Sequence, residues 1–190
     1  TYDLFKDCRP THQVAQGEAF EASYANIESR TQRSSLPVGM KLALLPKENR
    51  GNRVNAVLMF RYGSETDLTG KTDAASMIGQ MLMRGTTKHT RREIQDKLAE
   101  LKAQVRIGGF GRMGGRMMGG MGGGTAGALD VSIETTRENL APVLDLVGEI
   151  LRSPSFPAEE FDELKKETLA GIEESLSEPM TLAMNELQRR

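Results

Sequence analysis

Four stretches of the chain carry apolar residues in short runs or in alternation with polar ones, as half-buried strands do. A polar segment that contains Gly51 separates the first stretch from the second, and such a segment favours a turn. We therefore expect the first two strands to pair in antiparallel fashion. The predicted strands are Met40–Leu45, Val54–Tyr62, Gln104–Ile107 and Ala128–Glu134.

In other stretches apolar residues recur every three or four positions, the spacing that places them on one face of a helix. Thr90 with Glu93 and Thr135 with Glu138 form capping-box patterns, which mark two helix starts. Pro157 occupies a favourable first-turn position for a further, long helix. The predicted helices are Asp73–Met83, Thr90–Leu101, Leu140–Leu151, Ala158–Ser175 and a last one that opens at Glu178 and Pro179.

Pairs of strands alternate with groups of helices along the chain, which predicts an α+β domain of two layers. In that arrangement, helices cover one face of a mostly antiparallel sheet. Residues 1–35 are polar and lack clear periodicity, so we interpret them as a linker or N-terminal arm, and residues 36–190 as the domain. The chain ends inside a helix-like stretch, which favours a domain that is truncated at its C-terminus.

One segment, residues 108–124, interrupts this pattern because more than half of its residues are glycine and most of the others are methionine. Glycine loses more backbone entropy on ordering than other residues, so we predict a flexible insertion in a hairpin. An alternative is a flap near a substrate chamber, with methionine side chains as adaptable contacts. A dinucleotide fingerprint is excluded because these glycines lead into a strand, whereas the fingerprint opens a helix.

Composition narrows the function classes. The 190 residues carry a net charge of −1 and are 38% hydrophobic, as expected of a globular domain with a core. This balance gives no electrostatic argument for nucleic acid or an anionic membrane as partner. No apolar run approaches the roughly 20 residues of a transmembrane segment. The single cysteine, Cys8, has no metal-ligand spacing around it.

An ordered series of motifs carries a resemblance to a known family. A strand ends in Gly63-Ser64, a loop with Gly70 follows, and an apolar helix then closes at Gly85-Thr86. This series, with the helices that follow it, resembles the pitrilysin/insulinase and processing-peptidase group of zinc metallopeptidases over about residues 30–190. The resemblance implies an α+β fold of the LuxS and processing-peptidase type.

In active members of this family the helix carries the zinc motif H-x-x-E-H. The two histidines of the motif fall on Ser76 and Gln80 of this chain, and its glutamate falls on Gly79. Zinc peptidases need imidazole ligands and a carboxylate that acts as general base on the bound water, and these three residues supply neither. We therefore predict no catalytic residue, no metal site and no cofactor in this segment.

The resemblance implies that such a zinc-free half encloses a peptide or protein substrate opposite a catalytic half. That half would hold the zinc and would lie on the same chain or in a partner subunit. In the family, a substrate peptide can add to the strand beside the zinc helix. The peptide-contact candidates in this chain are therefore Gln104, Val105, Arg106 and Ile107. Bacterial members of this two-half kind are often exported, which favours the periplasm.

Two alternatives stay open. The chain could be a purely structural or interaction protein, like the proteolytically silent core subunits of respiratory complexes that resemble this family. It could also be a peptidase with an unrecognised site. An H-x-x-E-H half in the parent protein or an adjacent subunit favours the non-catalytic half. Zinc and hydrolysis in this segment alone favour the unrecognised site.

Overall fold

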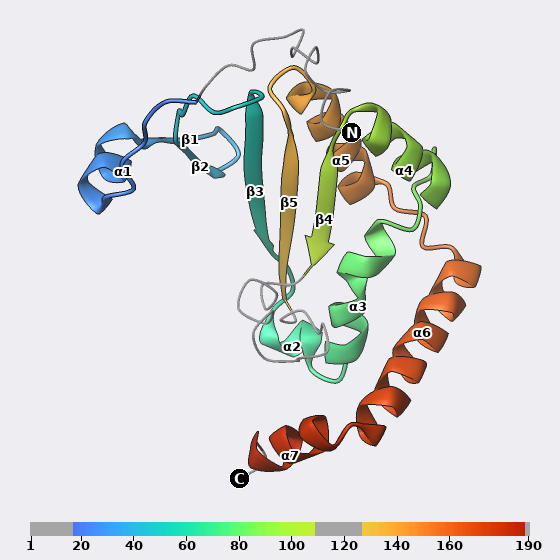
Figure 1. Cartoon of the computed structure of the whole chain (residues 1–190). Coiled ribbons are helices and arrows are strands. Elements are labelled where there is room, and N and C mark those ends of the chain that lie inside the picture. The colour runs from blue at the N-terminus through green and yellow to red at the C-terminus, as the bar shows by residue number, and fades with distance from the viewer. Residues whose placement is uncertain (1–16, 109–126, 189–190) are drawn as a thin grey trace, which may run out of the picture. The chain divides into compact units, whose positions relative to one another are not determined.

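The computed structural model describes residues 17–108 and 127–188 of the chain (Figure 1). The chain divides into two compact units, residues 1–53 and residues 54–190. Apart from Gly108, the glycine-rich insertion predicted over residues 108–124 lies outside the described residues, and so does Cys8.

The first unit consists of one helix and one hairpin. Its elements are helix α1 (Tyr24–Arg30) and the antiparallel strands β1 (Gln32–Ser35) and β2 (Lys41–Leu44). Ser23 caps α1 by accepting a hydrogen bond from the backbone amide of Asn26. None of the described residues of this unit is buried. Polar contacts link its parts, among them the ion pair of Arg30 with Glu18 at 2.9 Å.

The strand pairing in this unit differs from the prediction. Strand β2 pairs with β1, and not with β3 (Arg53–Arg61), which belongs to another sheet. The reason is the turn at residues 36–40, where the Leu36 amide donates to the Met40 carbonyl at 2.8 Å and closes a hairpin shorter than the predicted one. The polar pattern of residues 1–35 predicted neither α1 nor β1, because a capped turn and a backbone ladder need no apolar face.

The second unit is built on a three-stranded sheet in the order β3-β5-β4. Strand β5 (Ala128–Thr136) runs antiparallel to β4 (Gln104–Gly108). Strand β3 meets β5 where the Tyr62 amide donates to the Gly127 carbonyl at 3.0 Å. The helices of this unit are α2 (Glu65–Leu68), α3 (Thr72–Leu82), α4 (Arg91–Glu100), α5 (Leu140–Arg152), α6 (Ala158–Ser177) and α7 (Pro179–Gln188).

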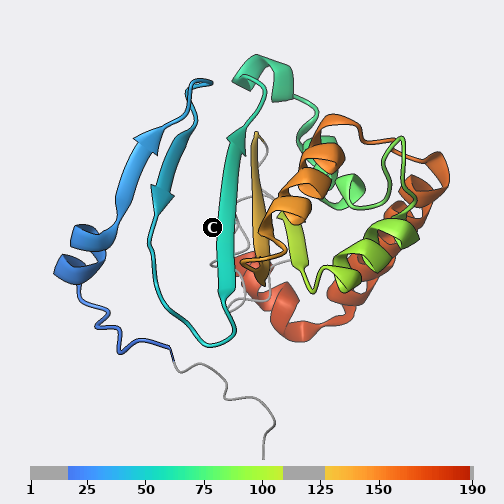
Figure 2. The same cartoon turned by 90° about the horizontal axis from the view of Figure 1, so that it is seen from above.

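Helices α3, α4 and α5 pack on one face of this sheet (Figure 2). Strand residues alternate between the two faces, so every second side chain of β4 and β5 enters the core. Burying each large aliphatic side chain contributes about 1.5–3 kcal/mol. The residues with almost no exposed surface in this core are Ile94, Val131, Ile133, Val143, Val147 and Ile150. The predicted two-layer α+β fold is confirmed.

The helix starts test the capping predictions. The Thr90 hydroxyl accepts from the Glu93 amide, and the Glu93 carboxylate accepts from the Thr90 amide at 2.7 Å, so this capping box is confirmed. The second predicted box is wrong, because Thr135 lies buried in β5, and α5 begins only at Leu140. No helix among the described residues is both long and apolar enough to cross a membrane.

Candidate functional site

The three residues at the family's zinc and base positions lie on α3, in different surroundings. The Ser76 hydroxyl donates to the backbone carbonyl of Asp73 at 2.7 Å, so it is engaged within its own helix. Gln80 is exposed, whereas Gly79 is buried. Within residues 17–108 and 127–188, no three His, Cys, Asp or Glu side chains come together as metal ligands.

Gly79 marks a close approach between α3 and strand β4. A Cβ atom at this position would lie 3.1 Å from the Cα atom of Gly108 and 3.2 Å from the carbonyl oxygen of Ile107. These are backbone atoms of a paired strand, which cannot move aside as a flexible side chain can. A side chain at the family's general-base position would therefore press on the backbone of β4, which would have to shift by a few tenths of an ångström. The residues present on α3 do not fit a catalytic zinc ion.

The chain between β3 and α3 fixes the direction of the helix. It turns at Gly63, whose φ of 70° favours glycine. The Ser64 hydroxyl and amide then donate to the Asp67 carboxylate at 2.7 and 2.9 Å, which lowers the pKa of that carboxyl. At the helix itself, the Tyr62 hydroxyl donates to the Ala75 carbonyl at 3.0 Å. These bonds hold the start of α3 against the end of β3.

The four predicted peptide-contact residues form strand β4, but their side chains point to opposite faces. Val105 and Ile107 are buried in the core, whereas Gln104 and Arg106 are exposed on the other face. Arg106 donates to the Gln104 side-chain oxygen at 3.2 Å. Only Gln104 and Arg106 can therefore offer side chains to a peptide. Peptide contact at this strand remains a prediction.

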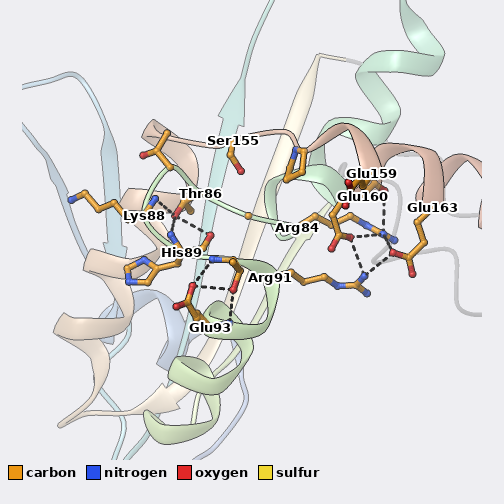
Figure 3. A pocket seen from close by; sticks show the side chains of 14 residues that line it. Arg84, Thr86, Lys88, His89, Arg91, Glu93, Ser155, Glu159, Glu160 and Glu163 are labelled. Atoms are coloured by element: carbon orange, nitrogen blue, oxygen red, sulfur yellow. Dashed lines mark hydrogen bonds and ion pairs between the residues drawn. The ribbon is translucent and has the colours of Figure 1, made fainter.

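A polar pocket of about 470 Å³ lies where the loop after α3 meets the N-terminal ends of α4 and α6 (Figure 3). Arg84 lines it and is 7% exposed. The Arg84 guanidinium pairs with Glu160 at 3.0 Å and with Glu167 at 2.7 Å, both on α6. Arg91 of α4 shares Glu160 at 3.1 Å. These ion pairs tie the end of α3 and the start of α4 to α6.

A second polar group joins the same loop to α5. The Glu149 carboxylate accepts from the Thr86 hydroxyl at 2.6 Å and lies 2.7 Å from Nδ1 of His89. The hydrogen bond from Thr86, followed by the contact with His89, lowers the pKa of Glu149. Nε2 of His89 lies 2.6 Å from the Lys97 ammonium. A neutral imidazole that donates from Nδ1 and accepts at Nε2 satisfies both neighbours.

Arg84 and Arg91 pair with Glu160 across this pocket, so its geometry includes a junction between helices. The sequence pattern did not predict this junction, because the Arg84 acceptor Glu160 lies 76 residues further along the chain. The available signal was an arginine placed directly after the apolar end of the predicted helix.

No protein-family model matches the chain, and no curated protein does either. Solved structures do match. An inactive domain of peptidase M16 from Pseudomonas fluorescens has a TM-score of 0.64 at 23% identity, over 83% of this chain and 34% of that one. The ferredoxin protease FusC, solved in complex with Arabidopsis ferredoxin, has a TM-score of 0.52 at 15% identity, over 77% and 14%. A protease from Helicobacter pylori has a TM-score of 0.50 at 18% identity, over 69% and 28%.

At sequence identities of 15–23%, structural similarity to these proteins establishes the fold of the chain and no more. The chain has the α+β fold found in protease structures, including a peptidase M16 domain that is inactive, and this confirms the fold that the resemblance implied. The chain covers only 34% of the length of that inactive-domain structure.

Proposed function

We propose that the chain is the non-catalytic half of a zinc-dependent metalloendopeptidase, which helps to enclose a peptide substrate and holds no zinc itself. The observation that carries this proposal is which residues α3 has at the zinc-ligand and general-base positions of the family. Ser76 and Gln80 stand at the ligand positions, and Gly79, which has no side chain, stands at the base position and packs closely on β4.

The likeness to the M16 inactive domain supports this proposal, because a domain described as inactive has the same fold. The catalytic half, with its own H-x-x-E-H motif, lies in this proposal on the same chain or in a partner subunit. The shape of the second unit also suits a wall. Helices cover one face of the β3-β5-β4 sheet. On the other face, Val57 and Met59 are 53% and 66% exposed among the described residues, which suits the lining of a chamber.

The zinc-free part of the proposal is tested on the purified chain by zinc titration calorimetry and by hydrolysis of a fluorogenic peptide. We expect neither zinc binding nor hydrolysis. The double variant Ser76→His/Gln80→His is the control. Residues four apart lie on one side of a helix, and here one position is half-buried and the other exposed, so two imidazoles should give a measurable zinc affinity without a base. Stoichiometric zinc with hydrolysis by the unmodified chain would identify a peptidase with an unrecognised site instead.

A further inference from the structure

A carboxylate, an imidazole and an amine form a continuous series of short contacts beside the loop after α3. The Glu149 carboxylate lies 2.7 Å from Nδ1 of His89, and Nε2 of the same ring lies 2.6 Å from Nζ of Lys97. The His89 and Glu149 side chains are 19% and 18% exposed, whereas Lys97 is an exposed residue of α4. The amine end of this series is therefore open to a reagent from solvent.

The order of these groups is the order in which proteins activate a nucleophile. In such an arrangement a base lies within hydrogen-bond reach of the nucleophile, and a third group orients the base. With its proton on Nδ1, which donates to Glu149, the His89 ring presents the lone pair of Nε2 to Lys97. The Glu149 carboxylate is held in turn by the Thr86 hydroxyl at 2.6 Å. Glu149 thus has the place of a positioning residue, and His89 that of the base.

Two carboxylates near the ring of His89 have separate roles. The Glu93 carboxylate accepts from the amide and the hydroxyl of Thr90 at 2.7 and 2.9 Å, so it serves the cap of α4. The pKa of Glu149 is lowered, first by the Thr86 hydroxyl and then by His89, so this carboxylate is ionised near neutral pH. An ionised Glu149 can balance the positive charge that His89 gains when Nε2 takes up a proton.

We propose that Lys97 is a site of acyl modification, where His89 assists the transfer of an activated acyl group from an acyl phosphate or a thioester to the lysine nitrogen. The inference is independent of the proposed function. The ammonium first loses one proton to solvent, and the neutral amine attacks the carbonyl carbon. The N–C bond forms, Nε2 of His89 takes the second proton from the nitrogen, and the bond from carbon to the leaving phosphate or thiolate breaks. A base favours this class of reagent, because the attacking nitrogen must lose a proton before the amide is complete.

The test measures acetylation rates at single lysines by mass spectrometry, with acetyl phosphate in one arm and an acetyl thioester in the other. Lys102 is the internal reference, because it is exposed just beyond the end of α4, and His89 contacts Lys97 instead. Digestion after glutamate separates the two lysines, since Glu100 lies between them. We expect Lys97 to react about tenfold or more faster than Lys102 in at least one arm, and the faster arm identifies the leaving group. Equal rates in both arms overturn the proposal.

Two variants separate assistance by a base from simple exposure of Lys97. His89→Gln keeps a polar side chain beside the amine but cannot take its proton, so Lys97 should then react no faster than Lys102. Glu149→Gln keeps an acceptor for Nδ1 but removes the negative charge, so the ratio of the two rates should fall part of the way. Thermal melts show that each variant is folded. A ratio that stays unchanged in His89→Gln overturns the proposal, and an unchanged ratio in Glu149→Gln overturns the role given to Glu149.

His89→Ala gives a readout that a purely structural role of His89 would not move. The truncation removes the ring, and imidazole added to the solution can take its place as the base beside Lys97. We expect added imidazole to restore the preference for Lys97 over Lys102. Imidazole in solution also promotes acetylation of both lysines, so the ratio of their rates is compared and not either rate alone. A ratio that imidazole leaves unchanged contradicts the assignment of His89 as the base.

Discussion

Gly79 has two consequences for this chain, one chemical and one for the packing of α3. It removes the carboxylate that a zinc peptidase needs, and it allows α3 to approach the backbone of β4 at Ile107 and Gly108. The first property follows from the motif frame between Gly63-Ser64 and Gly85-Thr86 and could be predicted from the sequence. The second could not, because residues 79 and 108 meet only in the folded chain.

Substitution of Gly79 distinguishes packing from helix propensity. Alanine normally stabilises a helix interior by up to about 1 kcal/mol relative to glycine. At Gly79 the added Cβ presses on strand backbone, so we expect Gly79→Ala to lower the free energy of unfolding by about 1 kcal/mol or more. Gly148→Ala in α5 is the control, because its Cβ meets nothing within 4 Å and the change should be neutral or stabilising. Urea unfolding of both variants measures the difference, and equal effects would contradict the close approach.

The contacts of Glu149 predict an acid-sensitive contribution to stability. Its pKa is lower in the folded chain than in the unfolded one, chiefly through the Thr86 hydroxyl. The ionised carboxylate therefore stabilises the fold above its ordinary pKa of about 4.3, and this contribution is lost as the pH falls through the folded value.

We expect Glu149→Gln to lower the free energy of unfolding near neutral pH and to approach the unmodified chain in acid. Chemical denaturation at both pH values gives the difference. Glu138→Gln, which changes an exposed carboxylate next to α5, should show no such convergence. A Glu149→Gln effect that stays constant with pH would mean that the ionised carboxylate contributes nothing.

At the scale of elements, local signals predicted most of the fold. The 3.6-residue periods and the Thr90 box gave α3 to α6, and alternation gave β3, β4 and β5. Where the predictions failed, the deciding contacts were long-range or the elements very short. The four-residue strand β1 pairs with β2, although β1 has no apolar pattern that would have predicted a strand. The four-residue helix α2 begins at a capping box formed by Ser64. The polar junction around Arg84 could not be predicted, because it depends on how α3, α4, α5 and α6 lie in the folded chain.

Arg84 is expected to fix α6 against α3. Its side chain is 8% exposed and pairs with Glu160 and Glu167, so Arg84→Met should lower the free energy of unfolding by about 2 kcal/mol, through lost charged hydrogen bonds. Arg92→Met is the matched control. The Arg92 side chain is 91% exposed and lies 3.9 Å from Asp96, and an exposed pair contributes at most about 1 kcal/mol. Thermal or urea unfolding compares the two, and equal losses would contradict a structural role for the junction.

At the scale of the whole molecule, the chain has a fold that is found in protease structures, and its helix α3 packs on β4 at Gly79. Ser76 bonds to its own helix, Gly79 lies on β4, and Gln80 faces solvent. The sequence could predict the missing zinc ligands because the motif frame is local. It could not predict the strand order β3-β5-β4, because that order depends on contacts between distant parts of the chain.

The most direct test of this account is a cleavage assay with the catalytic half, the protein or segment that carries H-x-x-E-H in the same chain or complex. Its turnover of a peptide substrate is measured with and without the present chain. We predict that the chain hydrolyses nothing alone and that adding it raises the turnover by about tenfold or more, because enclosing the substrate positions it for attack. Equal turnover with and without the chain would contradict a role as the substrate-enclosing half.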